Sequence, residues 1–203
     1  MKSAMSLNLR SYWAGFKAVL VFTVIVIVYT FVMTGIGQLG MPDKVNGSMV
    51  EDASGQVVGS SLIGQSFTDD KGNALPQYFQ SRPSAAGDNG YDASASSGTN
   101  KGHQDADLIK SVTDLRKQIA EREHVSVKDV PADATTSSSS GLDPAISPEY
   151  AAIQVKRVAD ARGLTEEQVE NVVKKNTTGR GLGFIGEPTV NVVTLNLDLD
   201  KLQ

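Results

Sequence analysis

The chain has 203 residues, of which 40% are hydrophobic and 21% charged, and its formal net charge is −4. This length corresponds to one or two domains. Cysteine is absent, which excludes disulfide scaffolds, thiolate metal sites and cysteine nucleophiles. The chain also lacks the basic excess typical of nucleic-acid-binding proteins, so no nucleic-acid partner is expected.

Charge is unevenly distributed along the chain. Residues 1–37 contain three basic residues, Lys2, Arg10 and Lys17, and no acidic residue. The remaining 166 residues hold 16 basic and 23 acidic residues, a net charge of −7. The sequence therefore divides into a basic, apolar N-terminal part and an acidic, polar remainder.

An apolar run from Ala18 to Ile36 predicts a transmembrane helix. As a helix, these residues would extend about 28 Å, close to the ~30 Å hydrocarbon core of a bilayer. Aromatic and basic side chains precede the run, where they favour the headgroup level. We predict a membrane-spanning helix over residues 12–36, anchored in the lipid bilayer by Trp13, Lys17, Phe22, Tyr29 and Phe31.

The basic residues before the apolar run also predict the orientation of the chain. By the positive-inside rule, residues 1–11 form a cytoplasmic tail and residues 37–203 form one extracytoplasmic domain, of mixed α/β composition and α+β class. A cleaved signal peptide has a similar pattern, and Gly35-Ile36-Gly37 is a weak cleavage candidate. A retained anchor is favoured, because the run is long for a signal peptide and no A-x-A motif follows it.

The first half of the polar part is expected to contain few regular elements. Short stretches over 48–50 and 56–58 flank a polar turn and predict a β-hairpin. Residues 84–104 are small or polar, which predicts a long loop of the kind that is often functional. Apolar residues recur at helical spacing over 105–123, so an amphipathic helix is predicted there.

The second half begins with a polar loop predicted over residues 131–148. A Ser-Pro pair and a glycine bound a predicted helix over 147–163. A capping box over Thr165–Gln168 begins another helix. Alternating apolar residues over 189–199 predict a strand at the end of the chain.

Three glycines, Gly181, Gly183 and Gly186, match the G-x-G-x-x-G pattern of dinucleotide sites. Such a site needs a strand before the glycines and a helix after them, whereas here the predicted order is reversed. The glycines are therefore expected to form a tightly packed turn. The serine-rich stretch 137–141 lacks a hydrolase motif, and the two histidines lack the spacing of metal ligands. No catalytic residue, metal site or bound cofactor is predicted.

Two groups of residues are candidates for a protein interface. Tyr78, Phe79 and Arg82 precede the long loop, and such residues often anchor interfaces, although a local core with a salt-bridged arginine fits them equally well. Gln154 and Arg157 share a polar helix face, which ordinary solvation also explains. The predicted partner-binding residues are Tyr78, Phe79, Arg82, Ser84, Ser138, Ser139, Gln154 and Arg157.

The sequence resembles the KdpC family, the C subunit of the bacterial potassium-transporting Kdp ATPase, over nearly its whole length. The resembling blocks are Gly59–Gln65, Tyr78–Ala85, Pro131–Ala134, Ser140–Pro148, Arg157–Leu164, Gly179–Pro188 and Val190–Asn196. The single N-terminal span also matches. Where family members tend to read Ser-Asn-Leu-Gly-Pro, this chain has Gly98-Thr-Asn-Lys-Gly102, which weakens the expectation of a fixed partner contact by that loop.

The resemblance implies a non-catalytic accessory subunit of an ATP-driven, high-affinity K⁺ import complex in the bacterial inner membrane. Its implied partners are a channel-like K⁺-translocating subunit, a P-type ATPase subunit and a small single-span subunit. ATP and K⁺ would act at the level of the complex. The family is also described as a catalytic chaperone that raises the ATP affinity of the ATPase subunit. Since the domain is expected outside, such an effect has to be indirect.

Two other functions compete with this interpretation. One is a membrane-anchored or secreted adhesion module or hydrolase that has no transporter partner. The other is a nucleotide-binding protein that uses the turn over Gly179–Gly186.

Overall fold

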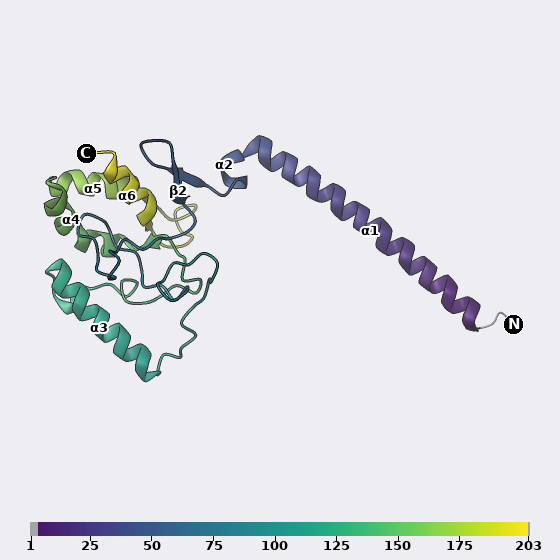
Figure 1. Cartoon of the computed structure of the whole chain (residues 1–203), viewed down its shortest axis with the longest axis horizontal. Coiled ribbons are helices and arrows are strands. Elements are labelled where there is room, and N and C mark those ends of the chain that lie inside the picture. The colour runs from purple at the N-terminus through teal and green to yellow at the C-terminus, as the bar shows by residue number, and fades with distance from the viewer. Residues whose placement is uncertain (1–3, 203) are drawn as a thin grey trace. The chain divides into compact units, whose positions relative to one another are not determined.

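The computed structural model describes residues 4–202, with side chains from Leu9 onward, and divides into two compact units (Figure 1). The first unit runs to Ser48, and the second begins at Met49. The first consists of helix α1 (Ala4–Gly40) and the short helix α2 (Pro42–Val45).

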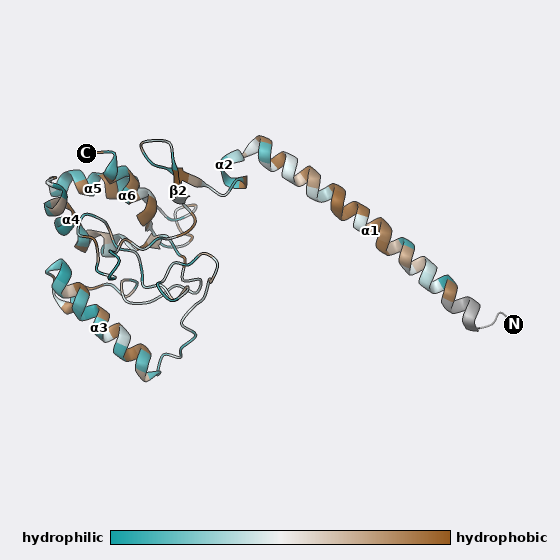
Figure 2. Ribbon diagram, viewed as in Figure 1, coloured by the Kyte–Doolittle hydropathy of each residue, from teal (hydrophilic) through white to brown (hydrophobic). Residues whose placement is uncertain are grey.

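Helix α1 contains the one candidate membrane span among the described residues, Leu9–Gly40. Figure 2 shows the mainly apolar colouring of its middle section. Its polar hydroxyls are satisfied within the helix, because Thr23 and Thr30 each donate to the carbonyl oxygen four residues earlier, at 2.8 and 2.9 Å. The helix contains the predicted span 12–36 and is longer, so residues 4–11 of the predicted tail are helical. Residues 1–3 lie outside the described part.

The predicted membrane-anchoring side chains all lie exposed along α1. The rings of Trp13 and Phe16 stack with their centroids 5.6 Å apart, and Lys17 Nζ lies 5.8 Å from the centroid of the Trp13 ring. The side chains of Phe22, Tyr29 and Phe31 are at least 63% exposed. This exposure suits a lipid environment, and contact with lipid stays a prediction.

The second unit begins with an antiparallel hairpin of β1 (Met49–Glu51) and β2 (Val57–Ser60), which confirms the predicted hairpin. The register shifts between Val50 and Glu51. From β2 to the next helix, the chain runs through a long irregular segment, visible in Figure 1. This segment contains the predicted loop over 84–104.

The rest of the unit is mainly helical. Its helices are α3 (Ala106–Glu123), a 3₁₀ turn (Val127–Asp129), α4 (Pro148–Arg162), α5 (Glu166–Lys175) and α6 (Val192–Asp200). The strands β3 (Ala145–Ile146), β4 (Thr177–Thr178) and β5 (Thr189–Asn191) form a small antiparallel sheet in the order β3-β5-β4. The predicted loop over 131–148 therefore includes one short strand, β3.

Side-chain caps explain where three of these helices begin. Asp105 caps α3, Ser147 caps α4, and Thr165 forms a reciprocal capping box with Gln168 at the start of α5. Helix α4 ends at Gly163, whose φ of 66° is left-handed. The helices predicted in these three places are confirmed.

The predicted strand over 189–199 is wrong beyond its first three residues. Asn191 ends β5 and accepts hydrogen bonds from the backbone of Val193 and Thr194, which begins α6. The buried residues that follow have helical spacing: Val192, Val193, Leu195, Asn196 and Leu199. The alternation of leucines and polar residues concealed this pattern, because Asn196 is buried although it is polar.

The hydrophobic core lies among α3, α4, α5, α6 and the small sheet. Tyr150, Val158, Val190 and Leu195 are at most 1% exposed. Phe79, from the irregular segment, is fully buried in the same cluster. The irregular segment is therefore part of the core of this unit.

Candidate partner-binding cleft

Arg157 on α4 fixes the irregular segment to the helices. Its guanidinium donates to the carbonyl oxygens of Pro76 at 2.6 Å and Tyr78 at 3.0 Å, and to Gln154 Oε1 at 2.9 Å. Its Nε donates to Glu123 Oε2 at the end of α3, at 2.9 Å. One side chain thus connects α3, α4 and the irregular segment.

Two buried amide side chains extend this connection by pairing with backbone groups. Gln154 accepts from the Gln80 N–H at 2.7 Å and donates to the Gln80 carbonyl at 3.2 Å. Asn196 on α6 makes the same pair of bonds with Phe79, at 2.9 and 3.0 Å. Buried backbone groups that lack a sheet neighbour need such partners. The two amides take the place of a neighbouring strand.

Glu123 is a buried charge that depends on arginines. Its side chain is 0% exposed, and it accepts hydrogen bonds from Arg122 and Arg157, whose side chains are 27% and 11% exposed. A buried carboxylate is tolerated when charged partners satisfy its oxygens. Arg122 also donates to the Tyr150 hydroxyl at 3.2 Å. Burial raises the pKa of Tyr150, so this hydroxyl is neutral near pH 7.

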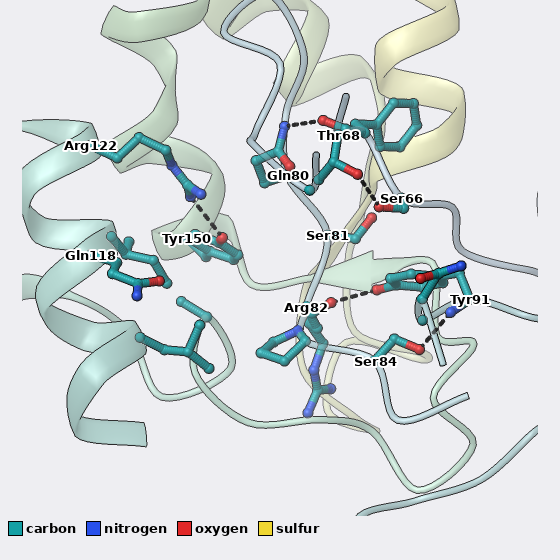
Figure 3. A pocket seen from close by; sticks show the side chains of 18 of the residues that line it. Ser66, Thr68, Gln80, Ser81, Arg82, Ser84, Tyr91, Gln118, Arg122 and Tyr150 are labelled. Carbon is teal, nitrogen blue, oxygen red and sulfur yellow. Dashed lines mark hydrogen bonds between the residues drawn. The ribbon is translucent and has the colours of Figure 1, made fainter. Parts of the chain in front are cut away.

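A cleft of about 470 Å³ lies between α3 and the irregular segment, which the side chains described above hold against the helices (Figure 3). Arg122 and Gln118 line it from α3, and Tyr150 lines it from α4. The irregular segment contributes mainly hydroxyl, amide and guanidinium groups: Ser66, Thr68, Gln80, Ser81, Arg82, Ser84 and Tyr91. We call this site the polar cleft.

Hydrogen bonds hold the wall of the polar cleft in place. Tyr91 donates from its hydroxyl to the Arg82 carbonyl at 2.7 Å, and its backbone N–H donates to Ser84 Oγ at 2.8 Å. Burial raises the pKa of Tyr91 to about 12, so this hydroxyl stays protonated near neutral pH. Arg82 binds Asp143 at 3.2 Å and the Thr136 carbonyl at 3.2 Å.

The polar cleft suits an uncharged polar ligand better than a phosphate. Both of its arginines already have carboxylate partners, Asp143 for Arg82 and Glu123 for Arg122. The remaining lining groups are hydroxyls, amides and the carboxylate of Asp88, which can donate and accept hydrogen bonds, as an extended peptide requires. The lining residues include no histidine or cysteine. The geometry therefore supports binding of a polypeptide segment.

The long loop over 84–104 lies against the 131–148 loop. Ser97 N–H donates to the Ser140 carbonyl at 3.0 Å, and Ser84 Oγ donates to the Gly141 carbonyl at 2.6 Å. Gly141 has a φ of 67°, and a Cβ placed there would lie 2.6 Å from the Ser97 carbonyl oxygen and 2.9 Å from the Ala86 nitrogen. Only glycine fits this crossing of the two loops.

Backbone groups add to the side-chain contacts between the 131–148 loop and the irregular segment. Besides the Ser97–Ser140 bond, the Gly64 N–H donates to the Leu142 carbonyl at 2.8 Å. Backbone hydrogen bonds of this kind fix the position of a loop without regular secondary structure. The wall of the polar cleft is therefore supported from behind by the 131–148 loop.

The structure places the predicted partner-binding residues in three different environments. Arg82 and Ser84 line the polar cleft. Ser139 is exposed and Ser138 half-buried in the adjoining loop, and Tyr78 is half-buried with Arg162 5.0 Å from its ring centroid. The other three side chains, those of Phe79, Gln154 and Arg157, face the interior.

Direct partner contact by Phe79 and Gln154 is contradicted by their burial, because both are 0% exposed. The alternative of a local core with a salt-bridged arginine describes Phe79 and Arg82 correctly. The alternative of a solvated helix face is also wrong for Gln154 and Arg157, since both bind the irregular segment. These residues position the cleft and do not line its opening.

Several residues of this site were not predicted from the sequence. Gln118 and Arg122 lie on the helix that was predicted, but its amphipathic pattern did not show which residues face a cleft. Tyr91 is the one aromatic residue in the stretch 84–104, which is the signal that could have identified it. Asn196 lies in the stretch that the sequence predicts to be a strand, so the sequence does not indicate its pairing with Phe79.

The glycine-rich turn and the two histidines were the other candidates for a nucleotide or metal site, and both lie at the surface. The turn over Gly181–Ile185 is a small hairpin, and a Cβ at Gly183 or Gly186 would meet no atom within 4 Å. The expected turn is present, but it is exposed and not tightly packed. Within residues 4–202, no group of three or more potential metal ligands is found, and both His103 and His124 are exposed.

These features define a mixed α/β protein with one candidate membrane span and a polar cleft in its folded domain. The family model described as "KdpC: K+-transporting ATPase, c chain" matches residues 12–201. The chain belongs to the KdpC family.

Close relatives support this assignment over nearly the full length. The chain is 50% identical over 195 residues to the potassium-transporting ATPase KdpC subunit of Mycobacterium tuberculosis, covering 95% of this chain and 99% of that one. It is 47% identical over 187 residues to the same subunit of Beijerinckia indica, covering 92% and 91%. The KdpC subunit of Kineococcus radiotolerans is 46% identical over 200 residues, covering 98% and 97%.

Replacing Arg157 with methionine should lower the free energy of unfolding by about 3–5 kcal/mol, because the buried Glu123 loses one of its two cationic partners. The matched control is Lys156→Met on the same helix, which removes an exposed ion pair worth about 0–1 kcal/mol. Urea unfolding of the full chain in detergent, followed by circular dichroism, measures both. Equal effects of the two substitutions would contradict the proposed role of Arg157.

Replacing Gly141 with alanine should destabilise the domain more than a left-handed backbone alone requires, because the added Cβ meets two backbone atoms. Gly72→Ala is the matched control, since Gly72 has a φ of 80° and open space around it. The control should cost about 1–2 kcal/mol, and Gly141→Ala clearly more. The same unfolding measurement applies, and a Gly141→Ala protein as stable as the control would show that the loop crossing tolerates a side chain.

Proposed function

We propose that this chain is a non-catalytic accessory subunit of an ATP-driven K⁺ import complex of the Kdp type. The observation that carries the proposal is its 50% identity to a potassium-transporting ATPase KdpC subunit over 95% of this chain and 99% of the relative. A match of this extent covers both the apolar helix and the folded domain. It favours this function over an unrelated adhesion module or hydrolase.

The apolar helix is proposed to be a retained anchor in the bacterial inner membrane. In support, the family match begins at residue 12, within α1, so the helix belongs to the shared sequence. The proposed boundaries remain a cytoplasmic tail over 1–11, a span over 12–36 and an extracytoplasmic domain over 37–203. The basic residues that precede the span favour a cytoplasmic N-terminus.

The proposed partners are the channel-like K⁺-translocating subunit, the P-type ATPase subunit and the small single-span subunit of the same complex. The polar cleft is the proposed docking site for a polypeptide segment of the channel-like subunit. Arg82 and Ser84 line this site, and Ser138 and Ser139 lie in the loop that supports it.

ATP is proposed to act on the complex and not in this chain. The glycine-rich turn connects two short antiparallel strands, β4 and β5, whereas a dinucleotide site needs a helix directly after its glycines. If the chain raises the ATP affinity of the ATPase subunit, an outward-facing domain must act through a coupled change of state. The span and the cytoplasmic tail are the parts of the chain that could transmit it.

Co-purification tests the proposed function directly. A tagged full-length chain, purified in a mild detergent from the cells that naturally produce it, should retain two larger membrane subunits and one small subunit. Deleting the chain should impair growth at micromolar K⁺. A lone monomer, together with normal growth after deletion, would contradict the proposal.

The role of the polar cleft can be tested in the same preparation. Gln118→Trp should fill part of the cleft and reduce recovery of the partner subunits at least tenfold. Gln104→Trp, at an exposed position just before α3, is the matched control and should leave recovery unchanged. Full recovery with Gln118→Trp would show that the partner does not occupy the cleft.

A further inference from the structure

The connection between β4 and β5 presents three large apolar side chains to solvent. Leu182 is 86% exposed, Phe184 is 72% exposed and Ile185 is 56% exposed. Large apolar groups gathered on one loop mark an interaction site more often than isolated ones do. We call residues 180–187 the glycine hairpin.

The glycine hairpin is closed by hydrogen bonds and an ion pair. Gly181 and Ile185 exchange two backbone hydrogen bonds, each 2.8 Å long. An ion pair between Arg180 and Glu187 joins the two ends of the hairpin. At the tip, Leu182 has a φ of 51°, which is unfavourable for a residue with a side chain. These contacts give the tip a defined turn structure within the chain itself.

The hairpin is also connected rigidly to the core of the domain. Thr178 in β4 pairs with Thr189 in β5, directly beyond its two ends. Val190 in β5 is fully buried, and Asn191 donates from its side chain to the Ser61 carbonyl at 2.7 Å. A preformed projection loses little conformational entropy when it binds.

The net charge of the domain bears on whether lipid or protein covers this tip. Residues 38–203 carry a net charge of −7, which opposes binding to an anionic lipid surface. Helices that lie in membrane interfaces usually carry Lys or Arg beside their apolar groups. Here Arg180 is already paired with Glu187. An apolar protein pocket therefore fits the tip better than a lipid headgroup layer.

We propose that the glycine hairpin inserts Leu182, Phe184 and Ile185 into an apolar pocket of a membrane subunit of the same K⁺-transporting ATPase. The inference rests on the proposed function, which supplies that partner. The hairpin would thus make a second, apolar contact with the complex, in addition to the polar contact proposed at the polar cleft. A binding interface needs a central buried cluster, such as an aromatic or aliphatic anchor in a pocket.

The natural absence of cysteine makes this proposal measurable, because one introduced thiol is the sole site for a maleimide. Phe184→Cys and Leu182→Cys report on the tip. Ala53→Cys, on the turn of the β1–β2 hairpin, is an exposed control. Fluorescein maleimide should react with all three at similar rates in the isolated chain. In the assembled complex, the tip positions should react at least tenfold more slowly, and the control at an unchanged rate.

Three results would overturn the inference. Rapid labelling of both tip positions in a complex that does contain the other subunits overturns the inference alone and leaves the proposed function standing. Protection of the tip in the chain reconstituted by itself, in vesicles of neutral and anionic phospholipid, assigns the tip to lipid instead. Failure of the wild-type chain to retain any subunit overturns the proposed function, and the inference with it.

Discussion

The side chain of Arg157 joins α4, α3 and the irregular segment, and the site depends on this connection. The irregular segment has no neighbouring strand to satisfy its backbone, so arginine and amide side chains from the helices do so. The buried carboxylate of Glu123 requires Arg122 and Arg157 to stay beside it, because an unpaired buried charge is strongly destabilising. Because these contacts fix one wall of the polar cleft, the shape of the cleft follows from a network in the interior.

The domain thereby presents two sites of different chemistry on one scaffold. The polar cleft offers hydroxyl, amide and ion-paired guanidinium groups and the carboxylate of Asp88, whereas the glycine hairpin offers apolar side chains from a closed turn. Both are fixed before binding, the first by the Arg157 network and the second by the sheet that carries it. Preformed surfaces of this kind lose little conformational entropy when a partner binds.

Local signals predicted much of the fold. The caps at Ser147 and Thr165 correctly predict the starts of two helices, and the apolar run correctly predicts a long apolar helix. Each of these signals is contained in one continuous stretch of the sequence. The cleft could not be predicted in this way. Arg157 and Pro76 are 81 residues apart, and nothing near either residue indicates their contact. Helix α6 was misassigned for the same reason, since the burial of Asn196 depends on Phe79, 117 residues away.

The central claim is that one span holds the folded domain on the outer side of the membrane, where it contacts its partners. Labelling of an Ala161→Cys variant on intact cells tests this most directly, because Ala161 lies exposed on α4 and the chain has no other thiol. A membrane-impermeant maleimide should label this position fully before the cells are permeabilised. Labelling that occurs only after permeabilisation would place the domain in the cytoplasm and contradict the claim.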